Sequence, residues 1–178
     1  MTFYQGTNGR VAVLIPGRSY SPNHPLLYYA RSVLLTQGWS VEEVWWEPKD
    51  LASEETVIKK AKATLDKVAD RNPLVVGKSL GSLVLPYVVQ RGWPAIWLTP
   101  LLNDPDLIAA LKNVKGKTLL VGGTADDYWD SNVAKTSGRQ VLELSGADHG
   151  LEIPGDPLAS VGILKEIVAT MTLFVESL

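Results

Sequence analysis

The segment Leu74–Gly81 places a serine between two glycines, in the order Leu-Val-Val-Gly-Lys-Ser-Leu-Gly. A short apolar run, then Gly-x-Ser-x-Gly, then a second apolar stretch is typical of a strand, a sharp turn and a helix, with the serine hydroxyl at the turn. The two glycines suit a strained turn in which strand and helix pack closely. The pattern therefore predicts that Ser79 is a nucleophile.

A serine hydroxyl needs a base to accept its proton, and this chain offers few candidates. It has two histidines, His24 and His149, and no cysteine, which excludes thiolate nucleophiles, thiolate metal sites and disulfides. His149 lies downstream of Ser79 in a Gly-Ala-Asp-His-Gly segment, directly after the strand-like run Val141–Leu144. His24 lies in a turn-rich Ser-Pro-Asn-His-Pro segment, where a capping or surface role is the default. We expect His149 to be the base.

The third group should be an acid that orients the imidazole and stabilises its protonated form. The strand-like run Thr118–Val121 leads into Gly-Gly-Thr-Ala-Asp-Asp, again a loop at the end of a strand, and we choose Asp126. The order serine, acid, histidine is that of α/β-hydrolases and differs from the orders in chymotrypsin and subtilisin.

These residues and their order resemble the α/β-hydrolase superfamily, in particular its compact members without a lid, related to dienelactone hydrolases and small carboxylesterases. The elbow Gly-Lys-Ser-Leu-Gly also looks like that of the KANSL3/Tex30-like branch. The resemblance extends from Val11 to the C-terminal helix and implies catalytic roles for Ser79, Asp126 and His149. It leaves Asp127 and Asp130 as less favoured acids. It identifies no substrate.

The chain departs from the superfamily pattern at the oxyanion hole, whose early loop often carries His-Gly. Here that loop reads Ile-Pro-Gly-Arg-Ser-Tyr over residues 15–20, and Pro16 has no N–H to donate. The donors must then be the backbone N–H of Gly17 or Arg18 together with that of Leu80, and we favour Arg18 and Leu80. The Arg18 side chain could bind an acidic substrate group, although a solvated surface arginine is the preferred interpretation.

Simpler interpretations compete with this one. Gly-Lys-Ser also ends a Walker A phosphate loop, but that motif needs glycine at position 72, where this chain has Asn72. His149 could be a structural histidine, and Asp126 could belong to an ordinary surface turn. The whole fold could also serve as a binding or scaffolding module in which the three side chains no longer catalyse.

Length and composition limit the number of domains and the kinds of partner that this protein could bind. With 178 residues and 46% hydrophobic content, the chain can bury one sizeable core, and no linker or repeat divides it, so we predict a single domain over residues 1–178. A net charge of −2 gives no electrostatic reason to bind nucleic acid or anionic membranes. No stretch of 18 apolar residues and no basic leader is evident, so a soluble, cytoplasmic protein is expected. The dispersed histidines and acids predict no metal site.

The coarse pattern alternates strand-like and helix-like segments, which predicts an α/β fold of three layers with a mainly parallel sheet of about six strands. The expected strands are Val11–Ile15, Val41–Trp46, Leu74–Val76, Ala95–Leu98, Thr118–Val121 and Val141–Leu144. The expected helices are Leu26–Gln37, Glu54–Arg71, Leu80–Arg91, Asp106–Leu111, Tyr128–Lys135 and Ala159–Glu176.

Several local features carry further expectations. Thr2–Gln5 could form an extra edge strand before an Asn-Gly turn, and Ser53 should cap the second helix. Pro86 predicts a kink or an early break in the helix after Ser79. The apolar stripe of the last helix should cover one face of the sheet, with a dimer seam as the alternative. That stripe consists of Val161, Leu164, Val168, Met171 and Val175.

Only residues 99–105 separate the fourth strand from the next helix, too few for a cap domain, so the serine should face an open cleft. A small soluble ester, thioester or lactone is the expected substrate. Tyr20, Tyr128 and Trp129, beside Gly17 and the acid, are candidates for substrate contact or for core packing, whereas Trp45, Trp46 and Trp97 should be core. Acyl transfer through a serine ester needs no cofactor.

Overall fold

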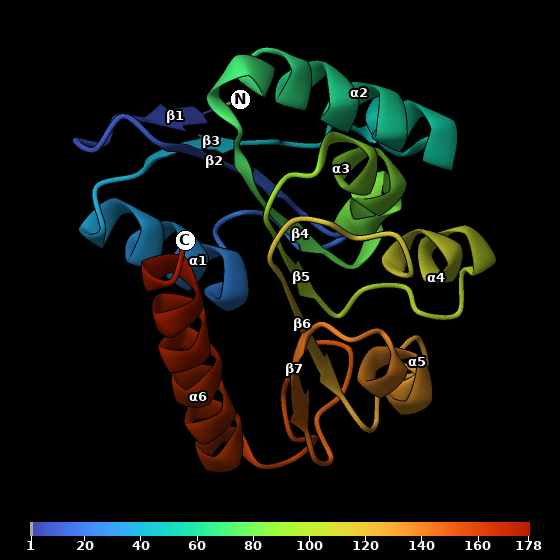
Figure 1. The fold of residues 1–178 in the computed structure, drawn as a ribbon. Helices are drawn as coiled ribbons and strands as arrows, with labels where there is room; N and C mark the ends of the chain where they lie inside the picture. The colour runs from blue at the N-terminus through green and yellow to red at the C-terminus, as the bar shows by residue number, and fades with distance from the viewer. Residues whose placement is uncertain (1) are drawn as a thin grey trace.

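The structure is a computed structural model that describes residues 2–178. In this part of the chain seven strands form one sheet, in the order β1-β3-β2-β4-β5-β6-β7 (Figure 1). β1 runs antiparallel to β3, and the other neighbouring strands are parallel. The strands are β1 Thr2–Tyr4, β2 Val11–Ile15, β3 Ser40–Glu43, β4 Leu74–Lys78, β5 Ala95–Leu98, β6 Thr118–Gly123 and β7 Gln140–Leu144.

Helices cover both faces of the sheet, so the fold has three layers. Helices α1 and α6 lie together on one face, and α2, α3, α4 and α5 lie on the other (Figure 1). The α-helices are α1 Pro25–Thr36, α2 Glu54–Asp66, α3 Leu85–Arg91, α4 Pro105–Leu111, α5 Ser131–Thr136 and α6 Pro157–Glu176. Short 3₁₀ segments are η1 Pro48–Leu51, η2 Ala69–Arg71 and η3 Ser79–Val84.

Two apolar cores result from the alternation of side chains along the strands. In β2, Val11, Val13 and Ile15 point into the core under α2, α3 and α4, whereas Ala12 and Leu14 point into the core under α1 and α6. Every residue of this strand is buried. Because both faces are covered, the central strands are continuous apolar runs, as a parallel sheet of this class requires.

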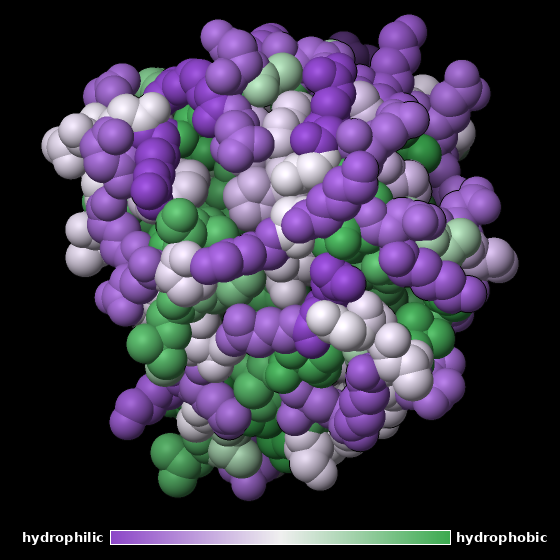
Figure 2. Space-filling view, in the orientation of Figure 1, coloured by the Kyte–Doolittle hydropathy of each residue, from purple (hydrophilic) through white to green (hydrophobic). Residues whose placement is uncertain are grey.

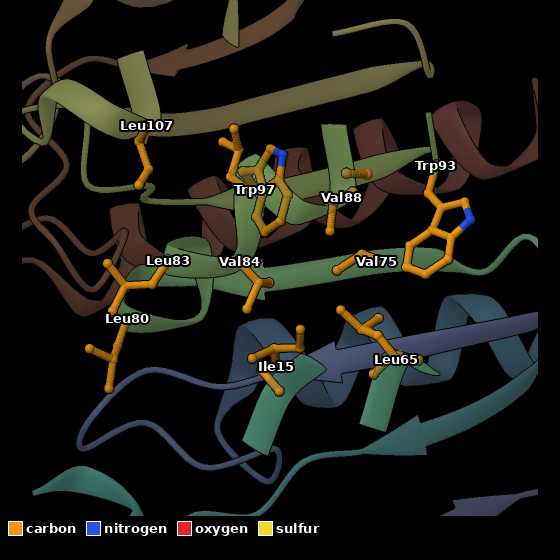
Figure 3. Close-up of a cluster of buried hydrophobic side chains, with 14 of the residues drawn as sticks. Ile15, Leu65, Val75, Leu80, Leu83, Val84, Val88, Trp93, Trp97 and Leu107 are labelled. Atoms are coloured by element: carbon orange, nitrogen blue, oxygen red, sulfur yellow. The ribbon is translucent and has the colours of Figure 1, made fainter. Parts of the chain in front are cut away.

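Figure 3 shows the first of these cores, with Trp97 of β5 among side chains from β4, η3 and α3. Trp97 is 1% exposed, which confirms the expected core position. Its ring lies directly over Gly77, where an added Cβ would come within 2.4 Å of it. Gly77 therefore also makes room for the buried Trp97 side chain in this core.

The predicted strands agree closely with the structure except at β3. This strand ends at Glu43 and not at Trp46, so the placing of Trp45 and Trp46 on a core strand was wrong. Both are only half-buried, and their indole N–H groups donate to the Glu43 carboxylate and to the Pro16 carbonyl respectively. The Val44 N–H still donates to the Leu14 carbonyl of β2 at 2.9 Å, and the chain then turns toward η1.

The extra edge strand exists as β1, but its partner is β3, so the Asn8-Gly9 segment does not close a hairpin with β2. The Asn8 side chain instead accepts from the Arg10 N–H at 2.9 Å in a local bend. Gly9 has φ +78°, the left-handed conformation that favours glycine.

The helix expected from Leu80 to Arg91 is divided in two. The chain leaves Ser79 as the 3₁₀ segment η3, and the α-helix α3 begins only at Leu85. Pro86 therefore occupies the first turn of α3, where its missing N–H costs nothing. The predicted break at Pro86 is confirmed.

Other helix boundaries differ for local reasons. The second helix ends at Asp66 and not at Arg71, and a separate 3₁₀ turn leads to Asn72, whose position before Pro73 disfavours helical conformation. Ser53 caps α2 as expected, since its Oγ accepts from the Thr56 N–H at 3.2 Å. The fifth helix starts at Ser131 and not at Tyr128, because Asp130 caps it.

The last helix packs on the sheet, but on a slightly different stripe from the one expected. Ile167, Met171, Phe174 and Val175 are buried, whereas Val161 is 62% exposed. Leu158 and Leu173 are also exposed, and Figure 2 shows apolar residues among hydrophilic ones at the lower left, where α6 lies. By length and composition alone, α6 is long and apolar enough to cross a membrane. This is weak evidence of a membrane span, because a helix that packs against a sheet can have the same length and composition.

Candidate active site

Three loops at the carboxyl ends of parallel strands meet at one edge of the sheet. Ser79 follows β4, Asp126 lies in the loop after β6, and His149 lies in the loop after β7. Because parallel strands end at a common edge, loops far apart in the sequence are brought together there.

Ser79, His149 and Asp126 form one hydrogen-bonded chain. His149 Nε2 lies 2.8 Å from Ser79 Oγ, and His149 Nδ1 lies 2.9 Å from both carboxylate oxygens of Asp126. An ionised carboxylate only accepts hydrogen bonds, so Nδ1 carries the proton and Nε2 is free to accept from the serine hydroxyl. The distances are those of a nucleophile, its base and an orienting acid.

Burial differs along this chain of groups. The Asp126 side chain is fully buried, whereas the His149 side chain is 34% exposed. The acid is thus shielded from water, while the imidazole and the serine hydroxyl face the cleft. This gradient suits a reaction in which substrate approaches Ser79 from solvent.

The backbone at Ser79 has the strained turn that the sequence predicted. Ser79 has φ +50°, which side-chain-bearing residues rarely adopt. A Cβ at Gly81 would come within 2.2 Å of the Ile15 carbonyl oxygen, so η3 can approach the end of the neighbouring strand β2 this closely only with glycine there. Strain and close packing together fix the serine at the apex.

The structure distinguishes Asp126 from its two neighbours. Asp127 is exposed, and Asp130 is occupied as the cap of α5, where its Oδ1 accepts from Asn132 and Val133 N–H groups at 2.8 and 2.9 Å. Asp126 Oδ1 also accepts from the Tyr128 N–H at 2.9 Å, which fixes the carboxylate beneath the imidazole. Of the three acids, Asp126 alone has a hydrogen bond to His149 among the described residues.

The early loop, residues 15–20, lies directly against Ser79. A Cβ added at Gly17 would lie 3.4 Å from Ser79 Cβ, so this loop and the serine are in contact. Leu80 N–H lies in the first turn of η3, where no intrahelical acceptor exists. The Arg18 side chain is exposed and donates from Nη1 to the Leu51 carbonyl at 3.1 Å, so its guanidinium is anchored to η1.

Two of the three candidate aromatic residues line the cleft. The Tyr128 ring is 44% exposed and lies 5.0 Å from the His149 ring. Tyr20 lines the cleft too, but its hydroxyl accepts from the Leu26 N–H at 3.0 Å, and burial raises the pKa of Tyr20 to about 12. Trp129 is buried against Gly122 and donates to Glu143, so it packs in the core and does not line the cleft over Ser79.

His24 lies outside the site. It occupies the residue before α1, but its side chain does not cap the helix; Nδ1 instead accepts from the Ser21 N–H at 3.0 Å. It is exposed, as the surface interpretation predicted.

The cleft over Ser79 has a volume of about 450 Å³ and opens to solvent, lined by the early loop, the elbow, Tyr128 and the His149 loop. A second groove of about 370 Å³ adjoins it, sharing Tyr20 and Gly150. Its wall is mostly apolar and is formed by Leu26, Leu151, Ile153, Pro157, Val161 and Leu164. The serine therefore faces an open cleft that continues into an apolar groove along the start of α6.

Sequence reasoning assigned no role to Lys78 and Thr99, although both lie at the site. Lys78 is 2% exposed, and its Nζ donates to Thr99 Oγ1 at 2.6 Å and to the His149 carbonyl at 2.7 Å. The available signal was a lysine at the end of an otherwise apolar strand, where a charged residue is seldom fully buried.

Lys78 gives a stability prediction. Burial lowers the pKa of Lys78 from 10.5 to about 8, against the opposing fields of Asp126 and Asp148. Between pH 8 and 10.5 the unfolded chain therefore binds more protons than the folded one, and the free energy of unfolding should rise with pH. Relative to Lys78→Met, the gain should approach about 3 kcal/mol.

Urea unfolding of both proteins at pH values from 7 to 10.5 measures this difference. Groups that titrate equally in the two proteins cancel in the comparison. Parallel curves for wild type and Lys78→Met would show that the buried amine does not titrate in this range.

No cluster of three or more histidine, aspartate or glutamate side chains that could hold a metal occurs among residues 2–178.

Comparisons with known proteins support the fold. No protein-family model and no curated protein sequence matches the chain. Solved structures do match: Est1E from Butyrivibrio proteoclasticus, with bound ferulic acid, has a TM-score of 0.76 at 12% identity, covering 99% of this chain and 93% of its own. A lid-less α/β serine hydrolase from Xanthomonas campestris has a TM-score of 0.69 at 14% identity, covering 97% and 84%. The Paleococcus ferrophilus monoacylglycerol lipase has a TM-score of 0.70 at 16% identity, covering 97% and 98%.

The chain therefore has the α/β-hydrolase fold, in its three-layer form without a cap domain. The fold class expected from the sequence is confirmed, with β1 as the added edge strand.

Proposed function

We propose that this protein is a serine hydrolase that cleaves a small ester, thioester or lactone through an acyl-enzyme. The observation that carries the proposal is the 2.8 Å contact between His149 Nε2 and Ser79 Oγ, continued at 2.9 Å to Asp126. Three side chains from separate loops rarely align in this order unless they act together.

In the first step Ser79 Oγ attacks the substrate carbonyl carbon while His149 Nε2 takes the hydroxyl proton. Asp126 stabilises the resulting imidazolium, and the backbone N–H groups of Arg18 and Leu80 are proposed to donate to the oxyanion. His149 then gives its proton to the leaving group, which departs and leaves the acyl-serine.

In the second step a water attacks the acyl carbon of the ester on Ser79, and His149 accepts the water proton. Collapse of the tetrahedral intermediate breaks the bond to Oγ, and His149 returns its proton to Ser79. The free acid leaves, and the enzyme is restored without a cofactor.

The shape of the site supports a small, accessible substrate. The open cleft lacks a cover, and the adjoining apolar groove beside α6 offers space for a short acyl chain or an aromatic acyl group. Est1E, the structural neighbour with ferulic acid bound, makes a feruloyl ester a reasonable test substrate. Since α6 packs Ile167, Met171 and Phe174 on the sheet, we propose that the enzyme acts in solution, and a cytoplasmic location stays a prediction.

Hydrolysis of p-nitrophenyl esters from acetate to octanoate, with methyl ferulate and an acyl thioester, tests the proposal. We expect turnover of the short esters well above the buffer rate, and a chain-length optimum that reflects the apolar groove. A well-folded protein that hydrolyses no member of the panel would favour the alternative of a binding or scaffolding module.

A further inference from the structure

Lys78 is a buried lysine without an ion pair among the described residues. It ends β4 directly before the nucleophile, and its Nζ contacts the Thr99 hydroxyl and the His149 carbonyl at 2.6 and 2.7 Å. The Tyr20 ring faces the ammonium group at 5.2 Å. Lys78 is 2% exposed, and it forms part of the wall of the cleft over Ser79.

Burying the Lys78 side chain at this position costs free energy of folding. Removing an ammonium group from water is unfavourable, and an apolar side chain of similar length would fill the same space without that cost. The preceding residues Leu74, Val75 and Val76 are all apolar and buried. What a lysine provides here, and an apolar side chain could not, is the pair of hydrogen bonds from Nζ to Thr99 and His149.

These bonds connect three loops of the site. Thr99 follows β5 and has φ +44°, and Leu151, two residues after His149, has φ +59°. Residues 2–178 contain four non-glycine residues with positive φ. Three of them, Ser79, Thr99 and Leu151, lie at or beside the groups that Lys78 connects. The loop conformations are strained, and such strain persists only where surrounding contacts hold it.

We propose that Lys78 is a positioning residue, whose Nζ holds the His149 carbonyl and so fixes the imidazole relative to the Ser79 hydroxyl. Lys78 and Ser79 are adjacent in the chain, so the group that anchors the base is attached directly to the nucleophile. A neutral amine keeps two N–H donors, enough for both bonds, so the role does not require the charged form. The inference rests on the proposed hydrolase activity.

The first test compares wild type with Lys78→Met, which keeps the length of the side chain and removes both hydrogen bonds. We expect kcat for p-nitrophenyl acetate to fall by about 100-fold, since small displacements of a reacting group have effects of this size, while KM changes little. The control is Lys60→Met, which removes a lysine that donates to the Trp45 carbonyl at 2.7 Å and does not line the cleft. It should keep wild-type kcat.

A spectroscopic measurement separates positioning from a general structural role. The proton that His149 Nδ1 shares with Asp126 should give a low-field NMR resonance in wild type and in Lys60→Met. In Lys78→Met we expect this resonance to shift or broaden while circular dichroism stays native. A merely structural lysine would lower thermal stability and leave both the resonance and kcat unchanged.

Thr99 provides a second variant should Lys78→Met fail to fold. Thr99→Val removes the hydroxyl that holds Nζ and should lower kcat by about tenfold, and Thr99→Ser, which keeps the hydroxyl, should recover most of the loss. Inactive wild-type protein would refute the hydrolase proposal itself. Active wild type with kcat unchanged in Lys78→Met, or in Thr99→Val if the first variant does not fold, would overturn the role of Lys78.

Discussion

Replacement of Ser79 by alanine should reduce kcat by about 10⁶-fold and leave the fold intact. In the proposed mechanism Oγ forms the acyl-enzyme bond, and no other hydroxyl contacts His149 Nε2 in the described part of the chain. The rate that remains should reflect only the acceleration that the proposed oxyanion hole and substrate binding provide without the nucleophile. Steady-state hydrolysis of the best ester in the panel measures the effect, with unfolding curves to confirm folding.

Ser145→Ala is the matched control for this variant, because Ser145 is an exposed serine in the loop that leads to His149. It loses the same hydroxyl from a position outside the hydrogen-bonded chain and should keep wild-type kcat. Comparable activity in Ser79→Ala and wild type would contradict the assignment of the nucleophile.

Replacement of Asp126 by asparagine should lower kcat by about 10⁴-fold. The amide is nearly isosteric, but its NH₂ can donate to His149 Nδ1 and so favours the tautomer with the proton on Nε2. That tautomer cannot accept the proton of Ser79. Hydrolysis rates measured on folded variants give the size of the loss.

The neighbouring acids supply the controls for the choice of Asp126. Asp127→Asn alters an exposed carboxylate, and Asp130→Asn keeps a good helix cap at α5, so both should retain near-wild-type kcat. A large loss of kcat in Asp127→Asn, together with near-wild-type kcat in Asp126→Asn, would assign the role of the acid to Asp127 instead of Asp126.

The sheet was largely readable from the sequence because its central strands are buried on both faces. Short apolar runs such as Val11–Ile15 and Ala95–Leu98 are typical of strands in a parallel sheet that is covered on both faces. The structure has these two strands with the predicted bounds. Glycine and proline then mark where each run must end.

Segments whose ends depend on tertiary contacts were predicted less well. The run Val41–Trp46 has strand propensity throughout, but β3 ends at Glu43, opposite Leu14 of β2. The indole N–H of Trp46 instead donates to the Pro16 carbonyl. Likewise, only the cap at Asp130 shows that Tyr128 and Trp129 precede α5.

The candidate site was predictable where residue type and order limit the choice. A single Gly-x-Ser-x-Gly and one downstream histidine leave few alternatives, whereas three nearby aspartates could be separated only by the path of the loop after β6. The role of Lys78 depends on the bond from its side chain to a backbone carbonyl 71 residues later, which no local pattern encodes.

Covalent labelling with a fluorophosphonate tests the central claim most directly, because the reagent needs a serine activated by its base but no particular substrate. We predict one adduct per wild-type molecule, located by peptide mass spectrometry at Ser79, with no adduct in Ser79→Ala and far slower labelling in His149→Ala. A folded wild-type protein that stays unlabelled, or carries the adduct on another residue, would contradict the account.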